Sequence, residues 1–141
     1  MPERLTEAEA NERFRTRDRL KSHGDYGCHV LVFRADEPEV ASREGWLWDE
    51  HFRSLWNTFS PDKDIGTIII DGDVHLDAEA NISDRLLCLV VTGNLIAKQF
   101  HIFETEVTVF GDCRAEFLTD HDGYLHVLGD CDVDTKASYD D

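Results

Sequence analysis

The side chains of this 141-residue protein that could do chemistry are its histidines and acidic residues. Of the 7 histidines, His101, His121 and His126 come nearest to forming a metal-binding set. His121 precedes Asp122, as a general base and its orienting carboxylate would. However, no histidine pair has a recognised ligand spacing, and residues 120–123 have turn composition. We therefore interpret the histidines as satisfied or solvent-exposed groups and predict no metal site.

Other motifs that would indicate catalysis or a cofactor fail at specific positions. Residues 62–66 approach a calcium-loop pattern, but their glycine is fifth instead of sixth and no glutamate closes the loop. The chain has no phosphate-binding loop, dinucleotide fingerprint or Gly-x-Ser-x-Gly motif. Its carboxylates are spread over turns, so no glycosidase pair can be assigned. We predict no catalytic residue, no cofactor and no enzymatic activity.

The cysteine pattern and the N-terminus predict a cytoplasmic protein. Four cysteines occur without a Cys-x-x-Cys pair, namely Cys28, Cys88, Cys113 and Cys131. In a cytosolic chain such cysteines are expected to be small buried hydrophobic residues and not disulfides or metal ligands. Residues 1–4 lack the layout of a secretory signal, and no apolar run reaches 12 residues, so we expect no membrane contact.

Negative charge dominates the composition and is concentrated in the second half of the chain. Acidic residues number 30 against 14 basic ones, a formal net charge of −16. Residues 61–141 hold 18 of the acids and 5 of the bases. Such a field repels nucleic acids and anionic lipids and accelerates encounter with cationic partners. An acidic surface also serves solubility alone, and this alternative stays open.

The first third of the chain is predicted to contain helix, strand and helix. Thr6 and Glu9 form a capping-box pattern that predicts a helix to about Lys21. The apolar residues of that helix are Ala8, Phe14 and Leu20. Residues 28–33 have strand composition. A second helix is expected over residues 43–58 because large apolar residues fall on one face. These are Trp48, Phe52, Leu55, Trp56 and Phe59.

A repeat aligned on glycine predicts the architecture of the second half. The four copies are Ile68–Leu76, Leu89–Ala97, Val107–Ala115 and Leu125–Val133. Their glycines are 21, 18 and 18 residues apart, a short fixed period with β composition that is typical of a solenoid. Apolar residues alternate on both sides of each glycine and would form an inner column, with coils stacked ~4.8 Å apart. Gly followed by Asp or Asn supplies the corner.

We therefore predict a mainly β protein, a short triangular parallel β-helix with coils of ~18 residues behind an N-terminal capping segment. The cap would span residues 1–61 and the acidic solenoid residues 62–141, as one compact folding unit. For the third face, the sequence leaves two alternatives for the residues that point inward. They are either Phe100 and Leu118 or Phe103 and His121. The three extra residues of the first coil are expected to bulge near residues 79–84.

Coils with the pattern V-V-x-G-[DN]-[LV]-x-[AV] resemble those of the bactofilin-like, polymer-forming β-helix proteins of bacteria. The resemblance covers about half of the chain and implies a right-handed β-helix that polymerises end to end. This chain departs from the family in having few coils and a tryptophan-rich N-terminal segment. That segment is suited to cover the N-terminal end of the solenoid, and a covered edge does not polymerise.

An outward strip on the solenoid is the candidate binding surface. Its residues are Asp71, Thr92, Phe110 and Leu128, with Ile69, Val90, Ile96 and Thr108 beside them. Around it the turns offer an acidic rim of Asp112, Glu116, Asp130, Asp132 and Asp134. The strip would be covered by the helix over residues 43–58, by a partner, or by a second copy in a homodimer.

The leading functional hypothesis is a non-catalytic immunity or inhibitor protein that neutralises a basic toxin, such as a nuclease, in the bacterial cytoplasm. The acidic rim would steer the basic partner and the apolar strip would hold it. One alternative is a bactofilin-like scaffold that self-associates. A second is a β-helix acyltransferase-like enzyme with His101 or His121 as general base, although the hexad pattern of those enzymes is mostly absent here.

Overall fold

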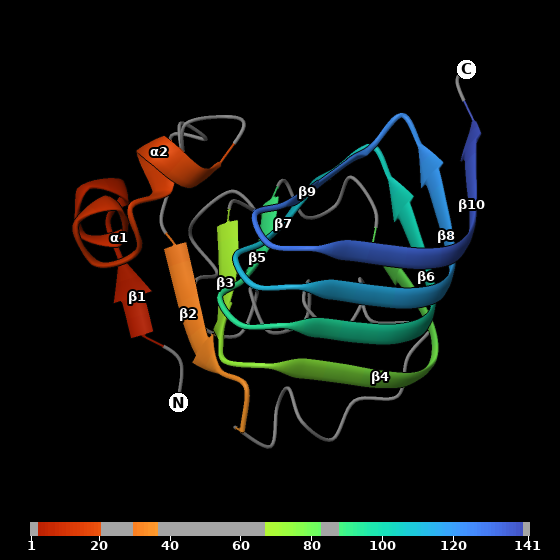
Figure 1. The fold of residues 1–141 in the computed structure, drawn as a ribbon. Coiled ribbons are helices and arrows are strands. Elements are labelled where there is room, and N and C mark those ends of the chain that lie inside the picture. The colour runs from red at the N-terminus through yellow and green to blue at the C-terminus, as the bar shows by residue number, and fades with distance from the viewer. Residues whose placement is uncertain (1–2, 21–29, 37–66, 83–87, 140–141) are drawn as a thin grey trace.

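The computed structural model describes residues 3–20, 30–36, 67–82 and 88–139, and its strands wind into a parallel β-solenoid of about 3 turns (Figure 1). Short strands form one sheet: β3 Thr67–Asp71, β5 Cys88–Val91, β7 Glu106–Val109 and β9 Tyr124–Val127. Nine-residue strands form the other: β4 Val74–Ile82, β6 Leu95–Phe103, β8 Cys113–His121 and β10 Cys131–Tyr139. The predicted mainly β solenoid is confirmed.

Each nine-residue strand bends once and so supplies two of the three faces. In β6 the side chains alternate between core and surface until Lys98 and Gln99, which are both exposed. The strand pairing between β6 and β8 skips Lys98 and its equivalent Glu116. Beyond this point the buried positions shift by one residue, which marks a corner and gives the triangular section.

The phase of the third face is settled by burial. Phe100 and Leu118 are 1% and 2% exposed and belong to the solenoid core. Phe103 and His121 point outward, and their rings stack with centroids 4.5 Å apart. The first of the two phases is therefore the correct one. A strict repeat of six residues per face would place Phe103 inward, because such a repeat does not allow two consecutive outward residues at the corner.

The coils stack in register, so equivalent residues lie above one another. Ile70, Val91, Val109 and Val127 form one such column. In the first coil, one of the three extra residues lies between Leu76 and Glu79, where the pairing with β6 shifts. The other two fall in residues 83–87, outside the described residues. The observed bulge thus lies just before the predicted range of residues 79–84.

The N-terminal segment begins with β1 Glu3–Leu5, α1 Glu7–Phe14 and α2 Thr16–Arg19. The predicted capping box is present, because Thr6 Oγ1 accepts the Glu9 N–H at 3.2 Å and Glu9 Oε1 accepts the Thr6 N–H at 3.2 Å. A single helix to Lys21 was the wrong prediction. Arg15 adopts a left-handed conformation with φ 56°, ends α1 and turns the chain into α2.

The turn at Arg15 also changes which residues are buried. Ala8 is exposed, and Ala10 takes its place in the interior beside Phe14 and Leu20. After α2, strand β2 Val30–Arg34 pairs in parallel with β3, and β1 pairs antiparallel with β2. The predicted strand is therefore present from Val30, and it extends the short-strand sheet at its N-terminal edge.

Several predictions concern residues that the structure does not describe. The tryptophan-bearing helix over residues 43–58 and the domain boundary at residues 61–62 lie outside the described residues, as do Cys28 and His29. None of the described helices has the length and apolar character needed to cross a lipid bilayer.

Candidate protein-binding site

A ladder of Asp and Asn side chains holds the corners of successive coils together. Asn94 donates its backbone N–H to Asp73 Oδ1 at 2.8 Å, and Asp112 donates its own to Asn94 Oδ1 at 2.8 Å. Asp130 in turn donates to Asp112 Oδ1 at 2.9 Å. Asp112 is therefore a member of the ladder as well as an exposed acid of the rim. The signal in the sequence was an Asp or Asn after each corner glycine.

Replacing Asn94 by alanine should lower the free energy of unfolding by about 0.5–1.5 kcal/mol, the net contribution of one such hydrogen bond. The loss stays modest because the Asp112 N–H is exposed and can bond to water. Urea unfolding followed by circular dichroism measures the change. Asn94→Asp retains the acceptor and should be closer to wild type in high salt, which screens its charge from Asp73 and Asp112. Equal losses in both variants would contradict the ladder.

Two more acids of the rim, Asp132 and Asp134, are paired with one arginine. Arg114 lies one coil away, with Nη1 2.9 Å from Asp134 Oδ1 and Nη2 3.3 Å from Oδ2. Its Nη1 is also 3.3 Å from Asp132 Oδ2. The hydrogen bond to Asp134, followed by the charge of Asp132, raises the pKa of Arg114 above its ordinary value. These groups are exposed, so the pairing organises the surface more than it stabilises the fold.

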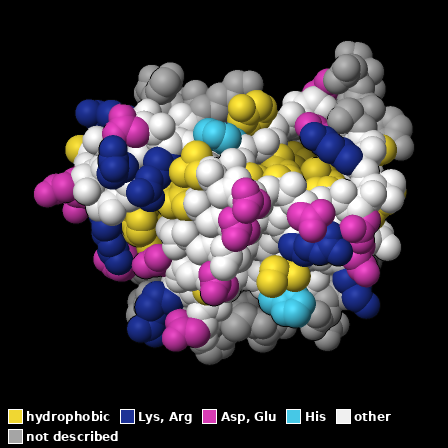
Figure 2. Space-filling view, viewed as in Figure 1, with side chains coloured by type: hydrophobic (Ala, Val, Ile, Leu, Met, Phe, Trp, Pro, Cys, Tyr) yellow, Lys and Arg dark blue, Asp and Glu magenta, His cyan; other side chains and the backbone are white. Residues whose placement is uncertain are grey.

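The rim is therefore less negative locally than the count of acids suggests. Figure 2 shows acidic and basic side chains side by side on the face made by the first halves of the long strands. Glu116 is exposed near Arg114, and Asp130 ends the corner ladder. Within the residues that the structure describes, the Asp130 carboxylate accepts no backbone N–H from a further coil. Glu116 and Asp130 are thus the rim acids most available to a partner.

Three residues of the outward strip, Ile69, Val90 and Thr108, are buried inside the molecule. Ile69 and Val90 point outward from the short-strand sheet, but they are 0% exposed. They share a cluster with residues of the N-terminal segment, including Leu5, Ala10, Phe14 and Leu20. Cover within the chain, one of the alternatives, is therefore correct for this part of the strip. The first helices contribute to it, whereas the helix over residues 43–58 lies outside the described residues.

Phe110 and Leu128, the two apolar residues predicted to bind a partner, differ in accessibility. Phe110 is half-buried against the N-terminal cluster, and the Arg19 guanidinium lies over its ring at 4.6 Å from the centroid. Leu128, one coil further on, is 43% exposed. Ile96 is also exposed, but it lies on another face, in register with His75 and Arg114. Leu128 is therefore the more accessible of the two predicted residues, and a role in binding stays a prediction for both.

Leu128 belongs to the C-terminal end of the solenoid, which no described coil follows. Strands β9 and β10 are the outermost strands of their sheets (Figure 1). The core residues of this last coil, Leu125, Val127 and Val133, are only partly buried, although they pack on the core cluster. Their equivalents one coil earlier are fully buried, namely Val107, Val109 and Ala115. This end is not evident from the sequence, because the residues that it exposes have the same inward positions and apolar types as the buried residues of earlier coils.

The histidines considered for chemistry are engaged in packing. His101 Nδ1 forms a hydrogen bond with Thr119 Oγ1, and the His121 ring stacks on Phe103. His126 lies on the short-strand sheet, with its ring 6.1 Å from that of Tyr124. Across the described ranges, no group of three or more His, Cys, Asp or Glu side chains is placed to hold a metal ion.

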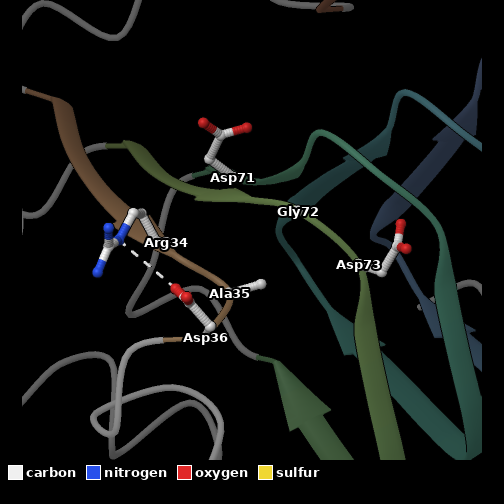
Figure 3. Close-up of a pocket in the computed structure, with 6 residues that line it drawn as sticks. All are labelled: Arg34, Ala35, Asp36, Asp71, Gly72 and Asp73. Atoms are coloured by element: carbon white, nitrogen blue, oxygen red, sulfur yellow. Dashed lines mark ion pairs between the residues drawn. The ribbon is translucent and has the colours of Figure 1, made fainter.

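A shallow pocket lies where the end of β2 meets the first corner (Figure 3). Its lining residues are Arg34, Ala35, Asp36, Asp71, Gly72 and Asp73. Each acid already has a partner: Asp36 pairs with Arg34 at 3.5 Å, and Asp71 Oδ1 accepts the Thr92 hydroxyl at 2.7 Å. Asp73 accepts the Asn94 N–H. The pocket is therefore a product of the corner geometry and offers no set of unengaged ligands.

No protein-family model matches the chain, and comparisons with curated proteins and with solved structures give no match either. The bactofilin-like resemblance accordingly stays a prediction from the repeat.

Proposed function

We propose that this is a non-catalytic, cytoplasmic protein that binds a basic protein partner at the C-terminal end of its solenoid, as an immunity or inhibitor protein for a basic toxin would. The observation that carries the proposal is the open last coil, where partly exposed core residues lie among acidic side chains. Unpaired strand edges and exposed apolar groups of this kind are used in protein recognition.

Charge complementarity supports a basic partner. The chain carries a formal net charge of −16, and no lysine or arginine occurs between Arg114 and Lys136. Arg114 neutralises part of the charge of Asp132 and Asp134. Asp130 and Glu116 are exposed and contribute their negative charge to this end. A field of this sign would accelerate encounter with a cationic protein and slow the approach of nucleic acids and anionic membranes.

The apolar part of the end would hold the partner after encounter. Leu128 is 43% exposed at the corner, and Leu125, Val127 and Val133 of the same coil are partly buried. Their arrangement gives an apolar centre with a charged margin, the usual anatomy of a protein–protein interface. The strand edge of β10 adds backbone donors and acceptors that a partner strand could use.

The test combines capture with a matched charge comparison. A basic partner retained from the source cell at low salt should be released as salt is raised. Removing two charges with Asp130→Asn and Glu116→Gln should slow association roughly three- to tenfold, measured by surface plasmon resonance. The control removes two charges on the N-terminal helices with Glu12→Gln and Asp18→Asn and should change the rate much less. Equal effects of both variants, or no basic partner at low salt, would refute the proposal.

Self-association as a scaffold is the second candidate, and one observation favours it. The corner ladder stops at Asp130, whose carboxylate is positioned as the acceptor for one more coil. Another copy could supply that coil at the β10 edge. Sizing chromatography coupled to light scattering separates the candidates. A scaffold grows with protein concentration, whereas a capture protein keeps one small size and binds its partner at 1:1.

A further inference from the structure

Two cysteines occupy neighbouring coils at the open end. Cys113 on β8 and Cys131 on β10 are register partners, each two residues after its corner glycine. Both thiols are free, and the neighbouring Cys131 is one of the causes that raise the pKa of Cys113. Cys113 is buried, as predicted for the cysteines of this chain, but Cys131 is exposed because no described coil follows β10. The prediction of a buried hydrophobic role is therefore wrong for Cys131.

The spacing of the two residues fits a disulfide bond. Paired strands lie ~4.8 Å apart, and disulfide-bonded cysteines have Cα atoms ~4.4–6.8 Å apart. In a parallel register both side chains point to the same side, so the strand spacing predicts Cβ atoms ~4.8 Å apart, slightly beyond the ~3.5–4.5 Å that the bond prefers. Strand β10 is paired with β8 alone among the described strands, so its free edge allows the small approach that is needed.

We propose that Cys113 and Cys131 are a reversible oxidation site, which a small-molecule disulfide such as oxidised glutathione converts into an intramolecular disulfide. Cys131 attacks one sulfur of the small disulfide and releases one thiolate, which leaves Cys131 as a mixed disulfide. Cys113 then attacks the Cys131 sulfur and displaces the second small thiol. The two protein thiols lose two electrons and two protons, and the small disulfide becomes two thiols.

Accessibility sets the order of these two steps. Cys131 is exposed and can meet the oxidant, whereas burial in the core, followed by the neighbouring Cys131, raises the pKa of the Cys113 thiol to about 12. Only the thiolate attacks, so the second step is the slow one and should accelerate about tenfold per pH unit below that pKa. Cys88 provides an internal comparison, because burial raises its pKa well above the ordinary value and it has no thiol neighbour among the described residues.

The bond would link two residues 18 positions apart and close a loop of one coil, which contains β8 and β9. Such a loop restricts the unfolded chain and ties the edge strand to the coil beneath it. The open end would then unfold locally less often when oxidised and more often when reduced. This chemistry needs no protein partner, so it can fail or succeed independently of the proposed function.

The experiment equilibrates the folded, full-length protein in oxidised and in reduced glutathione and then alkylates the remaining thiols. Peptide mapping should find Cys113 linked to Cys131 in the oxidised sample, with Cys88 alkylated only after denaturation. The midpoint of thermal unfolding should rise by roughly 5 °C on oxidation and return on reduction.

Single variants separate the two roles. Cys113→Ala should trap Cys131 as a stable mixed disulfide, whereas Cys131→Ser should leave Cys113 reduced. Circular dichroism checks that each variant folds, and Cys131→Ser is safe in this respect because the side chain is exposed. A wild-type protein that stops at the mixed disulfide on Cys131, that links two chains through Cys131, or that remains fully reduced would overturn the proposal.

Discussion

Replacing Gly111 by alanine is expected to lower the free energy of unfolding by about 3 kcal/mol, one of the two largest losses in this protein. A Cβ atom at this position would lie 2.7 Å from the Gly93 carbonyl oxygen and closer still to the Asn94 side chain. The backbone of two coils would have to separate, which would also weaken the 3.0 Å hydrogen bond from the Gly111 N–H to Gly93. Thermal unfolding should show a midpoint lower by about 10 °C.

A double variant distinguishes the backbone clash from the side-chain clash. In an Asn94→Ala background the contact with the amide is gone, but the Gly93 carbonyl remains. Gly111→Ala should therefore still cost most of the same free energy. If Gly111→Ala costs no stability in the Asn94→Ala background, the clash involves the Asn94 side chain alone. The close backbone stacking inferred at this corner would then be wrong.

The same corners explain why the solenoid could be predicted from the sequence. Close stacking excludes a Cβ atom at Gly93, Gly111 and Gly129, so glycine recurs wherever one corner lies on another. The alternation of apolar residues beside each glycine follows from the two sides of a strand. Both constraints repeat in every coil, and repetition makes them visible in a single sequence.

Features that occur once were not predictable in this way. The left-handed Arg15 splits the first helix, and local propensity gives no warning of it because the change is driven by burying Phe14 and Leu20 on the sheet. The burial of Ile69 and Val90 has the same origin. Period-2 alternation correctly places these side chains on the outer side of the sheet, but it cannot show that another segment covers that side.

The accessibility of the acids in the candidate binding surface could be predicted only in part, for a related reason. A count of charges cannot show which acids meet a base, so Asp132 and Asp134 were assigned to the rim although both contact Arg114. Asp112 was assigned there although it accepts a backbone N–H. Pairings between coils depend on the exact register, which the strand pairs provide. Glu116, Asp130 and Leu128 are exposed, and their role in binding stays a prediction.

The largest loss of stability is expected from Phe100→Ala, at about 3–5 kcal/mol. Phe100 is 1% exposed and is among the largest fully buried side chains of the described core. It stacks on Leu118 in the next coil, so truncation would leave a cavity between coils that the rigid ladders cannot easily close. The loss can be measured by urea unfolding, provided that the m-value, the slope of the unfolding free energy against urea concentration, equals that of the wild type. A changed m-value would indicate that the two proteins do not unfold between comparable states.

Phe103→Ala is the matched comparison, because it removes the same atoms from the same strand. Phe103 points outward, is half-buried and stacks on His121, so its truncation should cost clearly less, about 1–2 kcal/mol. Phe100 and Phe103 were the two alternatives for the inward position on the third face. Without two consecutive outward residues at the corner, Phe103 would point inward and Phe100 outward. A larger loss for Phe103→Ala than for Phe100→Ala would therefore contradict the consecutive outward residues at Lys98 and Gln99 and restore the strict six-residue phase.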